Sequence, residues 1–259
     1  MRVEKMTVVG QRRIAASVFE LKLTGKMAEE ATQPGRFVHV RVGGNAGRFP
    51  LLRRPISICC CNPGKREMTL IYKRVGVGTA WLADVRPGER LDVLGPLGNG
   101  FSLKSVPRGG RALIVGGGVG IPPLYGLAKA FAARAVVTTH ILGFRSAADC
   151  FYERQFAALG QTILLTEDGS AGRRGLVTDV LDSAGYDAVF ACGPLPMLRA
   201  LSKQVTGIPL YLSMEQRMGC GIGACLACAV QATDPADAKG YRRVCCDGPV
   251  FRAGEVELC

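Results

Sequence analysis

Four cysteines near the carboxyl end constrain the folding of this chain more than any other feature. Cys220, Cys225 and Cys228 form a C-x4-C-x2-C loop, and Cys245 follows after a gap. The segment that contains them, residues 213–259, is rich in Gly and Cys and shows neither helical nor strand periodicity. It is too short to bury a good hydrophobic core alone, so we expect a bound metal centre to organise it.

The spacing of this loop favours an iron–sulfur cluster over a zinc ion. A C-x4-C-x2-C loop with one distant Cys holds the [2Fe–2S] cluster of plant-type ferredoxins, whereas zinc ribbons show two separate C-x2-C pairs. Gly221 and Gly223 let the backbone curl so that amides can approach the cluster sulfurs. Structural zinc remains the alternative. Spacing alone does not choose between the adjacent Cys245 and Cys246 as the fourth ligand.

The other cysteines do not indicate a secreted disulfide framework. At 259 residues the chain is long for such a framework, its 11 cysteines are an odd number, and Cys59–Cys61 are consecutive. No stretch is long and apolar enough to cross a membrane, and Met1–Ser17 lacks the apolar centre of a signal peptide. We therefore expect a cytoplasmic protein that has no membrane segment and uses thiolate–metal chemistry.

The formal net charge of +12 raises nucleic-acid binding as a function class. The basic residues are scattered as pairs, such as Arg12–Arg13 and Arg173–Arg174, and no Lys/Arg run is interleaved with aromatic residues. We therefore expect no nucleic-acid partner. Anionic cofactors and an acidic partner surface account better for the positive charge.

Strand and helix patterns divide the chain into three predicted domains. Residues 1–105 carry short alternating strands between Pro- and Gly-bearing turns, which predicts an antiparallel β-barrel. Residues 106–212 alternate strands and helices, which predicts a doubly wound parallel α/β domain. Residues 213–259 form the cluster domain. The barrel strands are expected at Phe37–Val42, Ile56–Cys61, Met68–Lys73 and Leu91–Leu94. The α/β strands are expected at Ala112–Val115, Val136–Leu142, Thr162–Leu165, Ala188–Ala191 and Pro209–Leu212, and the helices at Pro122–Arg134, Phe151–Leu159, Leu176–Ser183 and Leu195–Gln204.

Two short motifs in the predicted barrel could contact an anionic cofactor. Arg54-Pro55-Ile56-Ser57 opens an apolar strand, where a guanidinium could pair with a pyrophosphate and a hydroxyl could reach a polar ring edge. Ile71-Tyr72-Lys73 follows, and then Gly78-Thr79, where free amides could bind phosphate. Taken singly, each motif also fits a solvated Arg pair, an ordinary strand and a turn.

A glycine-rich turn in the α/β domain indicates nucleotide binding. Gly116, Gly117, Gly118 and Gly120 come directly after a predicted strand and before a helix that starts near Pro122. Phosphates bind at this place in doubly wound sheets. Cys192, Gly193 and Pro194 follow another strand at the same sheet edge. The alternatives are a tight strand-to-helix turn and, for Cys192, a small buried hydrophobic residue.

The chain has no evident general base. Its only two histidines, His39 and His140, both fall inside predicted strands, where core or surface roles are expected. No Ser/His/Asp or Cys/His arrangement is apparent. The sequence therefore favours electron and hydride transfer over proton abstraction from carbon.

Together these motifs resemble the ferredoxin–NADP reductase superfamily, in which a flavin-binding barrel precedes a nicotinamide-binding α/β domain. Arg54, Ser57, Gly116–Pro122 and Cys192–Pro194 match its R-x-[Y]-S, GGxGxxP and CGP motifs, while Ile56 replaces a Tyr that stacks on the flavin in many members.

Within this superfamily the chain resembles the electron-transfer subunits of type B dihydroorotate dehydrogenases over its whole length. Arg53–Ile58, Met214–Cys228 and Val244–Phe251 carry this resemblance. In the family's V-C-x-D-G-P-V-F pattern the first Cys is the cluster ligand, which implies Cys245 rather than Cys246.

The resemblance implies FAD, one [2Fe–2S] cluster and NAD as cofactors. The implied FAD contacts are Arg54, Pro55, Ile56, Ser57, Ile71, Tyr72, Lys73, Gly78 and Thr79. The implied NAD contacts are Gly116, Gly117, Gly118, Gly120, Cys192, Gly193 and Pro194. The implied cluster ligands are Cys220, Cys225, Cys228 and Cys245. Glu167 and Asp168 would repel the 2′-phosphate of NADP, although Arg145 could attract it.

The resemblance also implies an oxidoreductase complex of pyrimidine biosynthesis. Its partner would be an FMN-containing dihydroorotate dehydrogenase catalytic subunit, with two copies of each subunit. Electrons would pass from the partner's FMN through the cluster and FAD to NAD+. The alternatives are a small flavin and iron–sulfur subunit of an NADH-dependent ferredoxin:NADP oxidoreductase or related hydrogenase, and a redox sensor that binds nucleotide without turnover.

Overall fold

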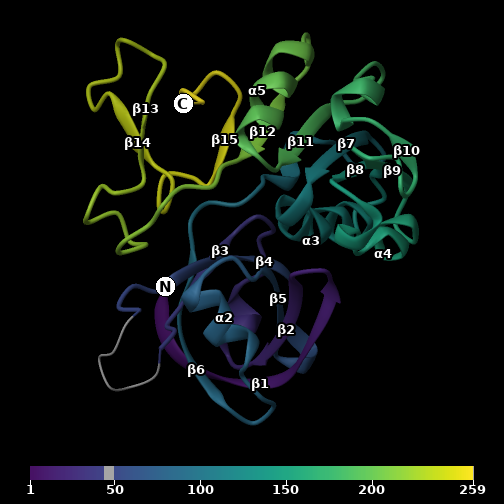
Figure 1. The fold of residues 1–259 in the computed structure, drawn as a ribbon. Coiled ribbons are helices and arrows are strands. Elements are labelled where there is room, and N and C mark those ends of the chain that lie inside the picture. Colours follow the sequence, from purple (N-terminus) through teal and green to yellow (C-terminus); the bar gives the residue numbers. More distant parts are fainter. Residues whose placement is uncertain (44–49, 259) are drawn as a thin grey trace.

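The computed structural model describes residues 1–43 and 50–258, in which a β-barrel, an α/β layer and a C-terminal segment can be distinguished (Figure 1). Cys259, for which the sequence suggests no role, lies outside these residues. None of the helices within the described ranges has the length and apolar character needed to cross a membrane.

The N-terminal part is a closed antiparallel barrel, as predicted. Its six strands follow the order β1-β2-β5-β4-β3-β6. They are β1 (Arg2–Ala15), β2 (Val18–Thr24), β3 (Phe37–Val40), β4 (Arg54–Asn62), β5 (Glu67–Lys73) and β6 (Arg90–Leu97). Alternate side chains such as Leu21, Val38 and Leu70 point inward and are fully buried. The short helices α1 (Met27–Glu30) and α2 (Val77–Ala83) and the 3-10 turns η1 (Pro63–Lys65) and η2 (Leu103–Ser105) lie in the connections.

The middle part is a parallel sheet with helices on both faces, which confirms the doubly wound prediction. The sheet order is β10-β9-β8-β7-β11-β12-β15. Its strands from this part are β7 (Arg111–Gly117), β8 (Val137–Phe144), β9 (Gln161–Thr166), β10 (Arg173–Arg174), β11 (Ala188–Cys192) and β12 (Leu210–Ser213). The helices are α3 (Ile121–Ala132), α4 (Glu153–Ala157) and α5 (Leu195–Gln204), and 3-10 turns lie at η3 (Gly118–Gly120), η4 (Ala147–Asp149) and η5 (Val177–Val180). In Figure 1, α3 and α5 lie on opposite sides of the sheet.

Two helix predictions in this part were wrong in extent. The helix expected at Leu176–Ser183 is only the turn η5, which begins with Asp179 accepting a capping hydrogen bond from the Leu176 amide and ends because the chain becomes extended at Leu181. Helix α4 is shorter than the predicted Phe151–Leu159, because Tyr152 adopts a left-handed conformation (φ +62°).

The C-terminal segment has a small buried cluster that it completes with barrel residues. Its strands β13 (Ala229–Gln231) and β14 (Tyr241–Arg243) pair with each other, and β15 (Val250–Arg252) pairs antiparallel with β12. Cys228 and Cys245 share one buried cluster with Phe37 of the barrel. The segment therefore depends on both other parts for its packing.

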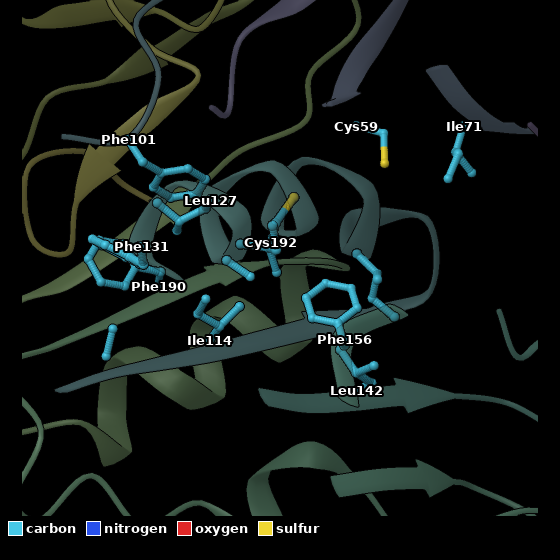
Figure 2. Close-up of a cluster of buried hydrophobic side chains, with 14 of the residues drawn as sticks. Cys59, Ile71, Phe101, Ile114, Leu127, Phe131, Leu142, Phe156, Phe190 and Cys192 are labelled. Atoms are coloured by element: carbon cyan, nitrogen blue, oxygen red, sulfur yellow. The ribbon is translucent and has the colours of Figure 1, made fainter. Parts of the chain in front are cut away.

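A hydrophobic core also joins the barrel to the α/β sheet (Figure 2). Cys59 and Ile71 belong to it from the barrel, and Phe131 and Phe190 belong to it from the α/β part. Helix α3 approaches β4 so closely that a Cβ on Gly126 would lie 2.6 Å from the Cys59 carbonyl oxygen. The sequence offered no role for Cys59, and the structure places it in this core.

One buried carboxylate links the barrel to the α/β part. Glu20 in β2 is 4% exposed and accepts hydrogen bonds from Arg12 Nε (2.9 Å) and from the Tyr152 hydroxyl (2.7 Å). Burial alone would raise the pKa of Glu20, but these two hydrogen bonds lower it below its ordinary value. Glu20 therefore stabilises the fold as an anion, and this contribution is lost as the pH falls through its lowered pKa.

We expect Tyr152→Phe to lower the free energy of unfolding by about 1–3 kcal/mol near neutral pH, because a buried acceptor loses its partner. The dependence of stability on pH below about 4.5 should also weaken, since the pKa of Glu20 moves back toward its unfolded value. Denaturant unfolding of the cofactor-loaded protein measures both effects. Tyr125→Phe removes a hydroxyl from a ring that packs against Tyr152 and is the control. Equal effects of the two variants would contradict the assignment.

Candidate functional site

Arg54, the first predicted flavin contact, lies at the beginning of β4 and beside the start of α2. A Cβ placed on Gly78 would lie 2.6 Å from Arg54 Nε, so the guanidinium rests directly over this glycine. Arg54 Nη1 also donates to the Leu52 carbonyl at 2.5 Å, which orients the side chain. The result is a fixed cation over a surface that exposes backbone, an arrangement suited to a diphosphate.

The other predicted flavin contacts have different environments. The side chains of Ile56 and Tyr72 pack into the barrel core, and Ile71 packs into the core between barrel and sheet. Pro55 is exposed, while Ser57 and Lys73 are half-buried. Ile56 therefore does not present its side chain as a stacking surface.

Thr79 differs from the prediction in a specific way. Its hydroxyl accepts hydrogen bonds from the amides of Val75 (2.9 Å) and Gly76 (3.1 Å) and so closes the turn before α2. The Gly76 amide is thereby engaged within the chain. The Thr79 hydroxyl is therefore engaged in this turn, while the Arg54 guanidinium lies over Gly78.

The two glycine motifs of the α/β part pack against each other. A Cβ on Gly120 would collide with the carbonyl oxygen of Cys192, and one on Gly193 would lie 2.5 Å from Met197 Cε and 3.1 Å from the Gly117 amide nitrogen. Only glycines permit this approach of the β7–α3 and β11–α5 turns. The structure therefore brings together two motifs that are far apart in the sequence, at the carboxyl edge of the sheet.

These turns form one wall of a pocket of about 600 Å³. Gly117 and Gly118 line it, whereas Gly116 does not. The charged side chains of its lining include Lys73, Arg145 and Glu167. Asp168 does not line it, because its carboxylate accepts hydrogen bonds from the Ser170 amide (2.9 Å) and hydroxyl (2.6 Å). Of the two predicted acidic residues, Glu167 is the one that lines this pocket.

Sequence analysis assigned no cofactor contact to Glu215, which lines the same pocket. Burial of its carboxyl raises the pKa of Glu215 above the ordinary value. Glu215 follows the last parallel strand and lies in the Met214–Cys228 stretch, where only the cysteines were assigned as ligands. Only the fold brings it to the nucleotide pocket.

Backbone amides surround the sulfur atoms of the cysteine loop. Cys220 Sγ accepts hydrogen bonds from the amides of Ile222 and Cys225, and Cys225 Sγ accepts one from Cys220, all at 3.4 Å. Gly221 (φ +74°) and Gly223 (φ +82°) provide the left-handed turns that direct these amides inward. Burial opposes ionisation of Cys220, but the amides prevail and lower its pKa to about 6. Such amide–sulfur bonds stabilise thiolate ligands of an iron–sulfur cluster.

Cys245 and Cys246 both lie beside this loop but in different environments. Cys245 is 1% exposed and donates its amide to Cys228 Sγ at 3.4 Å. Cys246 is half-exposed, and its sulfur faces Gly223, where a Cβ would approach it to 2.7 Å. The buried position next to Cys228 favours Cys245 as the fourth ligand.

The donor set fits a cluster better than a lone ion. Within residues 1–43 and 50–258, no three His, Cys, Asp or Glu side chains are arranged to hold a single metal ion. A [2Fe–2S] cluster divides four thiolates between two irons and so does not require them to meet at one point.

A residue outside the predicted set lies next to the loop. A Cβ on Gly221 would lie 2.6 Å from Nδ1 of His39, which is fully buried in β3. Burial, and secondarily the charge of Arg53, lowers the pKa of His39 to about 4, so the ring is neutral near pH 7. Burial likewise lowers the pKa of His140 to about 4. Neither histidine is placed as a general base on a substrate.

Comparison with known proteins points to the same family for the cluster loop and for the whole chain. Residues 215–257 match the family model described as the iron-sulfur cluster binding domain of dihydroorotate dehydrogenase B. The protein named "Dihydroorotate dehydrogenase B (NAD(+)), electron transfer subunit" of Bacillus caldolyticus is 52% identical over 257 residues, covering 98% of each chain. The protein of the same name from Lysinibacillus sphaericus is 51% identical over 260 residues, covering all of both chains.

Solved structures share the fold. The chain of an NADH-dependent reduced ferredoxin–NADP oxidoreductase superposes with a TM-score of 0.85 at 29% identity, covering 98% of this chain and 90% of that one. Phthalate dioxygenase reductase superposes with a TM-score of 0.63 at 16% identity over 94% of each chain, a likeness of fold alone. Identity above 50% over the full length is found with one family of relatives, and the chain belongs to that family, the electron transfer subunits of dihydroorotate dehydrogenase B (NAD(+)).

Proposed function

We propose that this chain carries electrons from an FMN-containing dihydroorotate dehydrogenase catalytic subunit to NAD+ in pyrimidine biosynthesis. The observation that supports the proposal most is the cysteine loop, whose sulfur atoms accept hydrogen bonds from backbone amides. The same fold contains the Arg54 site and a pocket lined by the glycine turns. The chain is an oxidoreductase subunit, and its family membership agrees with this electron relay. We place the complex in the cytoplasm, where thiols stay reduced.

Each cofactor has residues suited to it. FAD fits at Arg54 and Ser57, NAD in the pocket beside Gly120 and Gly193, and a [2Fe–2S] cluster at the cysteine loop. When bound, the flavin interconverts hydride and single-electron transfer, while the cluster carries one electron at a time.

The residues of the chain bind and orient these groups. The Arg54 guanidinium neutralises diphosphate charge, and the Ser57 hydroxyl offers a hydrogen bond to the polar edge of a ring. Gly120 and Gly193 let a dinucleotide approach the backbone. The amides of Ile222 and Cys225 stabilise thiolate charge on Cys220. Since neither histidine is placed as a base, proton removal from the substrate carbon belongs to the partner.

Glu167 supports the choice of NAD over NADP. Its carboxylate lines the nucleotide pocket near the end of β9, whereas Asp168 is held in the following turn. A carboxylate there accepts hydrogen bonds from ribose hydroxyls and repels a 2′-phosphate. Arg145 lines the same pocket, so the balance between the two side chains sets the preference.

We further propose that the catalytic subunit docks over the cysteine loop, with two copies of each subunit in the complex. Cys225 is exposed, and the neighbouring Ile222 and Leu226 are 46% and 48% exposed. Apolar side chains around an exposed ligand suit a protein interface, and docking there would bring the partner's flavin close to the cluster.

Anaerobic co-purification with the catalytic subunit tests the function. We expect flavin and iron–sulfur absorption, acid-labile sulfide, and dihydroorotate-dependent reduction of NAD+ only when both subunits are present. NADH should reduce an artificial acceptor through this chain alone, and NADPH should do so less well. Co-purification with a glutamate-synthase-like flavoprotein, without dihydroorotate activity, would favour the ferredoxin:NADP oxidoreductase alternative instead.

A further inference from the structure

His39 is buried in a way that the described protein atoms do not explain. Its side chain is fully buried in β3, and neither Nδ1 nor Nε2 has a hydrogen-bond partner. Among the side chains that the structure describes, it alone has two buried nitrogens that both lack partners. Burying polar atoms without partners is costly, so a partner from outside the chain is expected.

The other buried histidine provides a comparison. His140 in β8 is equally buried, but its Nδ1 lies 3.0 Å from Thr162 Oγ1 and forms a hydrogen bond. Its ring packs against Phe156 at 5.0 Å between centroids, inside the α/β core. His140 is therefore partly satisfied by its own domain, whereas His39 is not.

The position of His39 identifies where its partner must come from. In β3 it pairs with Pro55 of β4, the strand that carries Arg54 and Ser57. Its ring lies against the cysteine loop, since a Cβ on Gly221 would be 2.6 Å from Nδ1 and 2.9 Å from Cε1. The ring therefore lies between the strand expected to bind flavin and the loop expected to bind the cluster.

Nearby protein groups do not supply the missing hydrogen bond. The ring of Phe37 meets the imidazole edge-on at 6.2 Å and is apolar. The Arg53 guanidinium donates hydrogen bonds to the backbone carbonyl of His39 (3.3 Å) and to the Asp92 carboxylate (2.6 Å). A guanidinium has no acceptor, so it cannot accept a hydrogen bond from the ring N–H. Against the effect of burial, the backbone of Cys220 acts as an acceptor that raises the pKa of His39, but its geometry falls short of a hydrogen bond to either ring nitrogen.

We propose that the His39 ring donates a hydrogen bond to a sulfur atom of the cluster held by the Cys220–Cys228 loop, and that this bond raises the reduction potential of the cluster. The inference rests on the proposed function, because it requires the cluster. A neutral imidazole carries one N–H donor. Reduction adds negative charge to the cluster sulfurs, so a donor at this place stabilises the reduced form more than the oxidised form.

The close approach of Gly221 supports this role. With φ +74° and the imidazole against its Cα, residue 221 can only be glycine. The same turn directs the Ile222 amide onto Cys220 Sγ. The imidazole and the amide thus approach the loop from two sides, and His39 adds a side-chain donor to a set otherwise made of backbone amides.

Two variants of equal shape isolate the hydrogen bond. His39→Asn keeps an N–H donor near the position of Nδ1, and His39→Leu has the same branched shape without a donor. In the assembled complex, a redox titration followed by EPR should give the Asn variant a potential near that of the wild type. The cluster of the Leu variant should be harder to reduce. At a fixed applied potential its ratio of reduced to oxidised cluster should fall about tenfold, which corresponds to a reduction potential lower by about 59 mV. His140→Leu, equally buried but remote from the loop in the sequence and fold, should leave the cluster potential unchanged.

A measurement on the wild-type protein tests the hydrogen bond without relying on variants that could misfold. The chain has only two histidines, so labelling it with ¹⁵N-histidine leaves few sources of nitrogen coupling. Pulsed EPR of the reduced cluster should detect a weak ¹⁵N coupling that persists in His140→Leu. Absence of that coupling, a coupling as strong as that of an iron-bound imidazole, or a wild-type potential in a fully loaded His39→Leu protein would each overturn the inference. Wild-type protein without iron and sulfide would instead refute the proposed function.

Discussion

Cys245→Ala is expected to abolish nearly all binding of iron and acid-labile sulfide, while Cys246→Ala leaves both near wild-type amounts. Cys245 is buried beside Cys228 and donates its amide to that sulfur, which places it next to an expected cluster ligand. Cys246 is half-exposed and anchors the junction with the barrel through its carbonyl oxygen, which accepts from Asn99 Nδ2 at 2.9 Å. Alanine leaves this backbone bond intact.

Iron and sulfide analysis of anaerobically purified complexes measures this effect, with the visible spectrum as a second measure. The two variants are matched, because they remove the same thiol from adjacent positions. Loss of the cluster in Cys246→Ala with retention in Cys245→Ala would reverse the assignment. Retention in both single variants, with loss in the double variant, would mean that either sulfur can serve.

Arg54→Leu is expected to weaken FAD binding by roughly 10- to 150-fold for each charge-assisted hydrogen bond lost, which corresponds to about 1.5–3 kcal/mol. Two of the predicted flavin contacts, Arg54 and Lys73, are cationic, and the Arg54 guanidinium is the one that lies over Gly78. Gly78→Ala should weaken binding in the same direction, because its Cβ would displace the guanidinium while the backbone conformation remains permitted.

Gly76→Ala is the matched control for Gly78→Ala. A Cβ at position 76 would meet no protein atom within 4 Å, and the extended backbone there (φ −170°) accepts any residue. Equilibrium titration of deflavinated complex with FAD gives the dissociation constants. Equal weakening by the two alanine variants would mean that the turn, and not the position of Arg54, controls binding.

The barrel could be predicted because short strands with alternating polarity lie between turns that carry Pro or Gly. The doubly wound sheet could be predicted because apolar strands alternate with helices along the chain. The long strand β1 escaped prediction, since charged residues such as Glu4 and Lys5 interrupt its apolar pattern. The predicted Leu176–Ser183 helix is a single capped turn, because the chain becomes extended at Leu181. The helical spacing of apolar residues does not show where such a turn ends.

The candidate site was predictable where short motifs carry the chemistry, as at the cysteine loop and the glycine turns. Glu215 and His39 were not, because each reaches the site only through the pairing of distant segments. Sequence analysis could place His39 in a strand but could not show that the cysteine loop would close over it. The prediction for the Thr79 hydroxyl stays untested as a cofactor contact, although the structure uses that hydroxyl to close its own turn.

The pairing of β15 with β12 has a consequence for maturation of the protein. Before the last residues fold back, β12 is a bare sheet edge with unpaired amides and carbonyls, open to strands of other molecules. The segment that shields this edge is also the one that carries the cysteine loop. Chains produced under iron starvation should therefore self-associate at this edge, so that a shortage of metal shows first as poor yield and aggregation, before any catalytic defect can be assayed.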